Sequence, residues 1–158
     1  MSTQLFSEFI SDLAQRRSLR REVEGGQVTY RLKLEGSSVV TIVTDETNPD
    51  SSAKVTSESW PAPSDPASRV ELMRNALNFN RNAFHHLPCA IVRDPDASAN
   101  FRLIWWVAPV RVDANDWRDQ LLLFGKLASK AWTVMAAPKV EHSRAPSLGE
   151  AGYSIFIP

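Results

Sequence analysis

The segment from Val70 to Leu87 constrains the fold most, because its apolar side chains recur with the period of an α-helix. At about 100° per residue, apolar residues occupy one half of the helix circumference and polar residues the other. Asn80 is the one polar residue among the apolar ones. A helix needs an apolar stripe of about 100° to cover one core. We therefore expect part of this helix to face something other than its own sheet. The apolar half contains Val70, Leu72, Met73, Ala76, Leu77, Phe79, Ala83, Phe84 and Leu87.

Two strands are predicted after this helix, Leu87–Val92 and Phe101–Val107, with a turn at Asp94-Pro95-Asp96 between them. Alternate residues of the second strand form one apolar face, but Ile104 and Trp106 make the other face apolar too. A strand that is apolar on both faces is normally covered on both faces. Surplus apolar surface on the helix and on the strand together indicates contact with a partner chain.

Two further helices follow from the same periodicity and from capping residues. Leu5–Arg17 is amphipathic, and a third helix is expected to begin after Asp113, whose carboxylate suits an N-cap. The central helix is expected to begin with Asp65 as N-cap and Pro66 at the first helical position. The arginines of Arg16–Arg21 are best explained as a solvated helix end, where cations interact favourably with the helix dipole.

Three strands are predicted between the first two helices. Gln27–Glu35 alternates strictly between apolar and polar residues, Val39–Thr44 is rich in β-branched residues, and Lys54–Trp60 is a weaker candidate. Their short connections favour an antiparallel meander. The order is therefore α-βββ-α-ββ-α, with helices packed on a twisted, mostly antiparallel sheet in an α+β fold. One domain is expected over residues 1–136, followed by a C-terminal extension, 137–158, with an apolar end.

Composition argues against several classes of function. The 158 residues carry 18 basic and 18 acidic side chains, so the formal net charge is zero. Nucleic-acid-binding proteins usually carry a basic excess, and we expect no nucleic-acid partner. Cys89 is the only cysteine, which fits a reducing cytoplasm. No apolar run approaches the roughly 18–20 residues of a membrane-spanning helix, so no membrane span is expected.

The strongest catalytic candidate is His85-His86 followed by Cys89. A reactive thiolate needs a nearby base, and a metal ion needs three or four converging ligands. Adjacent histidines on a helix diverge by about 100°, so they do not easily share one ion. A polar helix end followed by a small buried cysteine explains the same residues. We expect no catalytic residue, no metal site and no cofactor, in a protein that is not an enzyme.

Tryptophan is a more informative signal, because its side chain anchors both cores and interfaces. Trp105, Trp117 and Trp132 lie on the apolar faces of their predicted elements, and we expect them in the core. Trp106 lies on the opposite face of its strand and is expected to contact a partner.

In its order of elements, the chain resembles the class I type III secretion chaperones, the family of the Tir chaperone CesT and of SycE. The resemblance covers Leu5–Met135, from the opening helix through the meander Val28–Trp60 to the Trp-containing final helix. It implies a cytoplasmic bacterial homodimer without ATPase activity. Such a protein binds the N-terminal region of secreted effectors in extended form and delivers them for secretion. The secretion-apparatus ATPase would be a further partner.

The resemblance also implies where the contacts lie. Dimerisation in the family centres on the second helix and neighbouring strands, matching the surplus apolar surface. Asn80 would pair across the two-fold axis and fix register, as a buried Asn does in coiled coils. Effector segments would bind the first helix and exposed sheet residues, unless that helix face is entirely core. The dimer-interface residues are Val70, Met73, Leu77, Asn80, Phe84 and Trp106, and the effector-binding residues are Phe6, Phe9, Ile10 and Leu13.

Two other functions stay open at this point. A non-catalytic regulator or immunity-type protein of the same fold would mask a folded partner, which needs a preformed patch of at least ~1,000 Å² in total. An enzyme using His85, His86 or Cys89 is the other.

The extension ends in the apolar, β-prone run Tyr153–Ile157, after a polar linker with two prolines. Such a run is an aggregation hazard when it is left in water. We expect it to dock on its own or its partner's domain, in an apolar groove or at a sheet edge that also accepts a client.

Overall fold

The computed structural model of the chain describes residues 3–34, 39–94 and 100–135. The helices are α1 (Phe6–Arg17), α2 (Pro66–Ala83) and α3 (Ala114–Met135). The main sheet consists of β2 (Arg21–Glu24), β3 (Gln27–Lys33), β4 (Val39–Asp45), β5 (Ala53–Ser57), β6 (Trp60–Pro61), β7 (Cys89–Arg93) and β8 (Asn100–Val107). A separate two-stranded pairing joins β1 (Thr3–Gln4) to β9 (Val112–Asp113).

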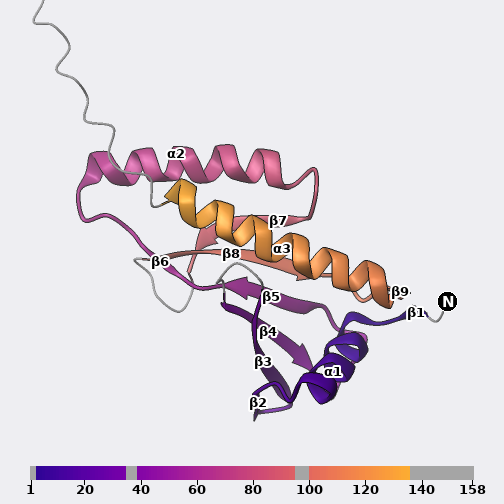
Figure 1. Cartoon of the computed structure of the whole chain (residues 1–158). Coiled ribbons are helices and arrows are strands. Elements are labelled where there is room, and N and C mark those ends of the chain that lie inside the picture. Colours follow the sequence, from indigo (N-terminus) through magenta and orange to yellow (C-terminus); the bar gives the residue numbers. More distant parts are fainter. Residues whose placement is uncertain (1–2, 35–38, 95–99, 136–158) are drawn as a thin grey trace, which may run out of the picture.

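The predicted α+β class is confirmed: three helices accompany a mostly antiparallel sheet in the part of the chain that the structure describes. The predicted order of elements is present, with the short strands β1, β2, β6 and β9 added to it. The expected extension, 137–158, lies outside the described residues. Figure 1 shows α3 running across β7 and β8, α1 lying near the ends of β3 and β4, and α2 running beside the sheet next to β7.

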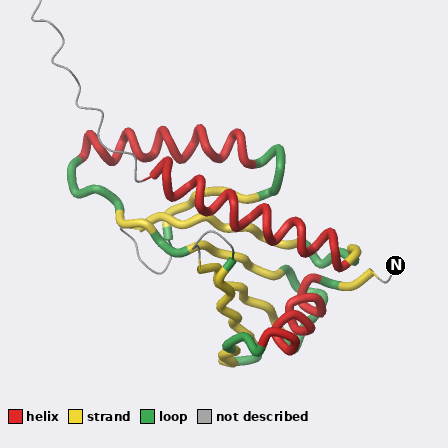
Figure 2. Tube along the Cα trace, in the orientation of Figure 1, coloured by secondary structure: helices red, strands yellow, loops and turns green. Residues whose placement is uncertain are grey.

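The seven-stranded sheet is organised around β8. One side of β8 pairs with β5 and then with β6, and its other side pairs with β7. From β5 the sheet continues through β4 and β3 to β2, which forms the far edge. Strand pairs along this path are antiparallel, as the predicted meander requires. Figure 2 shows the strands as one twisted layer.

The core lies on one face of this sheet, where the side chains of β8 meet α1 and α3. The ring of Phe6 packs edge-on against Trp105 and Trp117, with centroid distances of 5.5 and 5.2 Å. Trp105 also stacks with Phe124 at 6.0 Å. The indole Nε1 of Trp117 donates a hydrogen bond to the carbonyl oxygen of Gln4 at 2.9 Å. The expectation that Trp105 and Trp117 are core residues is confirmed, because each is 2% exposed.

Trp132 is a correction, because half of its surface is exposed rather than buried. It lies in the last turn of α3 that the structure describes, where its ring contacts the tilted ring of Trp60 at 6.3 Å. Gly125 in the same helix packs closely against Leu34, just after the end of β3. A Cβ there would lie 2.6 Å from Cδ1 of Leu34.

The start of α2 confirms the capping prediction. Asp65 has extended backbone angles, and its carboxylate accepts a hydrogen bond from the backbone N–H of Ser68 at 2.8 Å. The basic cluster is only partly a helix end. Arg16 and Arg17 lie in the last turn of α1, but Arg21 begins β2 and forms an ion pair with Glu46.

Asn80 attaches α2 to the edge of the sheet. Its side-chain nitrogen donates to the carbonyl oxygen of Ile91 at 3.0 Å, and its side-chain oxygen accepts from the N–H of Ile91 at 2.6 Å. Both groups belong to the outer edge of β7. The expectation that Asn80 pairs across a two-fold axis is therefore wrong, because both ends of its amide are used within its own chain.

We predict that Asn80→Ala lowers the free energy of unfolding by about 1–3 kcal/mol, because it leaves the N–H and C=O of Ile91 without their partners. Urea denaturation at one fixed protein concentration measures this value. Arg74→Ala is the control, because Arg74 is exposed in the middle of the same helix and arginine and alanine have similar helix propensities. Equal effects of the two substitutions would show that the Asn80 hydrogen bonds do not hold α2.

Candidate interaction surface

A row of apolar side chains on α2 is left in solvent. Val70, Met73, Leu77 and Phe84 are 58%, 45%, 69% and 66% exposed. They follow the spacing i, i+3, i+7 and i+14, which is that of the apolar seam between two coiled-coil helices. We call these four residues the apolar stripe.

The apolar stripe exists because α2 buries only part of its wide apolar arc. Leu72, Ala76, Phe79 and Ala83 are buried. In a view down the helix axis, at about 100° per residue, Asn80 lies between Phe79 and Leu77, and it faces the edge of β7. Since Phe79 contributes to the buried side and Asn80 meets β7, the stripe lies beyond the sheet edge, on the side away from α3. All four of its residues are among those predicted for the dimer interface.

The sheet face opposite the core is the second candidate surface. On this face, Thr41, Val43, Lys54 and Val92 are half-buried and Trp106 is exposed, whereas Thr56 and Ile104 at its centre are buried. Trp106 is 60% exposed, as its position on the strand predicted. The ammonium of Lys54 lies over its ring, 5.7 Å from the centroid. We define the open face as Thr41, Val43, Lys54, Val92 and Trp106.

The predicted effector-binding face of α1 needs a correction. Phe6, Phe9 and Ile10 are 3%, 8% and 0% exposed, so they belong to the core and offer no surface to a client. Leu13 is half-buried and packs against the same core. The physical reason is that β8 and α3 both direct aromatic side chains at this face of α1, which therefore has no free apolar side.

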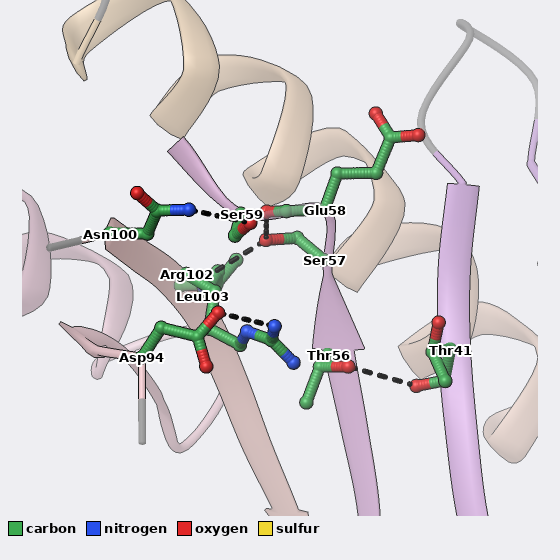
Figure 3. A network of polar contacts seen from close by, with 9 residues as sticks. All are labelled: Thr41, Thr56, Ser57, Glu58, Ser59, Asp94, Asn100, Arg102 and Leu103. Carbon is green, nitrogen blue, oxygen red and sulfur yellow. Dashed lines mark hydrogen bonds and ion pairs between the residues drawn. The ribbon is translucent and has the colours of Figure 1, made fainter. Parts of the chain in front are cut away.

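A polar network at the end of β8 was not predicted from the sequence (Figure 3). Asp94 is buried and forms an ion pair with Arg102 across the β7–β8 hairpin. The N–H of Asp94 also donates to the carbonyl oxygen of Asn100 at 2.8 Å. The turn predicted at Asp94-Pro95-Asp96 falls mostly on residues 95–99, which lie outside the described residues. The sequence predicted a turn here, but it did not predict that the carboxylate of Asp94 is buried against an arginine.

The same network supplies a backbone partner where β5 ends. The N–H of Leu103 points to the gap between β5 and β6, and the hydroxyl oxygen of Ser57 accepts it at 3.0 Å. The Ser57 hydroxyl donates in turn to the carbonyl oxygen of Glu58 at 2.8 Å. These contacts hold β8 in place across a break in the ladder, and so they position Trp106 on the open face.

The residues considered for catalysis are not arranged for it. His85 and His86 are exposed in the turn after α2, whereas Cys89 is 2% exposed at the start of β7. Burial raises the pKa of the Cys89 thiol to about 11, so the thiol is protonated at neutral pH. Across the described ranges, no group of three or more His, Cys, Asp or Glu side chains is placed to hold a metal ion.

No helix in the described part of the chain has both the length and the apolar character needed to cross a bilayer. Comparison with known proteins finds no match: no family model matches the chain, and no curated protein or solved structure is significantly similar to it. The resemblance to the secretion chaperones therefore rests on the order of elements alone.

We predict that Cys89 reacts with a thiol reagent at pH 8 at least a hundredfold more slowly in the native protein than in urea. At that pH a thiol with a pKa of about 11 is ionised in only about one molecule in a thousand. The raised pKa also makes stability depend on pH. The folded state keeps the full contribution of the protonated thiol below about pH 9, and this contribution is lost as the pH rises towards 11, because the unfolded state ionises first. Cys89→Ala should lack this part of the alkaline stability loss. Rapid labelling of native protein would contradict the buried position.

Proposed function

We propose that the chain is a non-catalytic, homodimeric binding protein of the class I type III secretion chaperone kind. In this function it binds the N-terminal region of effector proteins in extended form and delivers them for secretion from the bacterial cytoplasm. The observation that carries the proposal is that the large apolar side chains of the apolar stripe, and Trp106 on the open face, are exposed beside a filled core in the described part of the chain. The α+β fold and its order of elements agree with the resemblance.

The apolar stripe is the proposed dimer contact. Four large apolar side chains exposed in one row have an unfavourable free energy of hydration, and exposed patches of this kind mark interaction sites. Their coiled-coil spacing suits a second helix with the same spacing, so a second copy of α2 would complement the stripe. Asn80 takes no part in this contact, because its amide is occupied by Ile91.

The open face is the proposed client site, because α1 has no free apolar side. We assign Trp106 to the client rather than to the dimer contact. An extended segment would lay its apolar side chains across Trp106 and Val43. Strand addition at an edge is less suitable. Asn80 occupies the outer edge of β7, and β2 carries charged residues that discourage pairing with a further strand.

We predict that Leu77→Asp converts a dimer to a monomer at micromolar concentration. Burying an unpaired carboxylate at the centre of the contact costs several kcal/mol, whereas in a monomer the side chain stays in water. Light scattering gives the molar mass. Asn78→Asp places the same charge on the neighbouring residue, outside the stripe, and should leave the dimer intact. A monomeric wild-type protein would refute the homodimer.

We predict that Trp106→Ala weakens binding of an extended effector segment by at least about 2 kcal/mol, the usual cost of losing a tryptophan anchor. Co-expression with candidate effectors identifies one whose N-terminal segment co-purifies. Titration of that labelled segment then gives the affinity. Trp132→Ala is the matched control, because Trp132 is also exposed but lies on α3.

If Trp106→Ala and Trp132→Ala bound the segment with equal affinity, the assignment of the client site to the open face would be wrong. Binding only to a folded partner, with no affinity for its isolated segments, would favour the regulator or immunity-type function instead.

A further inference from the structure

A groove runs between α2 and α3, on the side of α2 away from the apolar stripe. Its volume is about 220 Å³. Phe79, Ala83 and Leu127 form a buried floor, and exposed polar side chains of both helices form the rims. The lining residues are Asn75, Asn78, Phe79, Asn82, Ala83, His86, Leu127, Lys130 and Val134.

Three asparagines give one rim of the groove its chemistry. Asn75, Asn78 and Asn82 share one side of α2, and each amide offers both a hydrogen-bond donor and an acceptor. Four residues of helix advance by about 6 Å, the separation of Asn78 and Asn82. An extended chain presents backbone N–H and C=O groups to the same side every second residue, or about every 6.6 Å. The rim therefore matches the backbone of an extended peptide.

The other side of α2 already binds an extended chain in this way. The amide of Asn80 holds both backbone groups of Ile91, the central residue of β7. An asparagine on this helix can therefore hydrogen-bond to both the N–H and the C=O of one residue in a strand that runs alongside the helix. Asn78 and Asn82 offer the same side chain to the groove.

We propose that this groove binds an extended apolar peptide, and that its occupant is Tyr153–Ile157 of the same chain. In an extended conformation, Tyr153, Ile155 and Ile157 point to one side and suit the apolar floor. Lys130 lines the groove, and its positive charge is opposite in sign to that of Glu150, which precedes the segment by three residues.

The connection favours the chain's own segment over other peptides. Val134 lines the groove and Met135 is the last described residue of α3, so the segment that follows begins beside the groove. Residues 136–149 can span at most about 46–50 Å, which exceeds the length of either helix bordering the groove. A segment tethered in this way has an effective concentration in the millimolar range. The inference does not rest on the proposed function, because it requires neither a client nor a second copy.

Disulfide trapping in the full chain tests the proposal. Asn75→Cys is combined with Ser154→Cys, which leaves Asn78 and Asn82 in place, and a bond can form only when the two Cα atoms approach within about 7 Å. The native Cys89 does not compete, because it is buried and its pKa is raised to about 11. Under mild oxidation at pH 8, we expect an intramolecular disulfide, seen as a faster band on a non-reducing gel.

Leu77→Cys with Ser154→Cys is the matched control, because Leu77 lies two residues further along α2 but belongs to the exposed apolar stripe. We expect the Asn75 pair to close at least ten times faster. Equal rates would show an undocked segment, and a faster Leu77 pair would place it on the stripe. Products linked only between chains would assign the groove to another copy. Each of these results would overturn the proposal.

Amide hydrogen exchange provides a measurement without added cysteines. We expect Tyr153–Ile157 to exchange at least tenfold more slowly than an unstructured peptide of the same sequence. Replacing Asn78 and Asn82 together by Ala should remove that protection without changing the exchange of α2 itself. Protection that survives the double substitution would refute the role of the asparagines.

Discussion

The two hydrogen bonds between the Asn80 side chain and the backbone of Ile91 decide where α2 lies, and much of the surface follows from that position. They place the helix beside the sheet edge instead of over a face. A helix over a face would bury most of its apolar arc. A helix at the edge can bury only the side that meets α3 and β7, so Val70, Met73, Leu77 and Phe84 remain in water. The same position creates the groove between α2 and α3.

The sheet shows a similar division. Its core face is filled by α1 and α3, whose aromatic residues pack around Trp105. No helix of the described ranges packs on its open face, where Trp106 is exposed and Val43 is half-buried. Hydrophobic surface exposed next to a well-filled core is the basis of the proposed binding function, because packing alone gives no reason to leave it uncovered. The polar network around Ser57 and Arg102 belongs to this division, since it holds β8 rigid where its ladder is interrupted.

Much of the fold could be predicted from the sequence, because amphipathic periods, prolines and capping residues act locally. Asp65-Pro66, the alternation in β3 and the surplus apolar arc of α2 are signals of this kind. The partner of a side chain is not local. An amphipathic pattern in α1 does not distinguish a core face from a client-binding face, and the position of Trp105 and Trp117 settled that for Phe6. Asn80 likewise looked like an interface residue until its backbone partner was known. β2 was missed because its four residues are exposed and mostly charged, without an apolar alternation.

The link between the start of the chain and its last described helix has a consequence for synthesis. Thr3 pairs with Asp113, Gln4 accepts a hydrogen bond from Trp117, and Phe6 packs against both Trp105 and Trp117. The ribosome makes α1 about a hundred residues before these packing partners, a delay of roughly 5–20 s at common rates of elongation. During that time the apolar face of α1 has no core to enter. The growing chain therefore carries Phe6, Phe9 and Ile10 in water until the sheet and α3 have emerged, which makes this helix the segment most in need of protection before folding is complete.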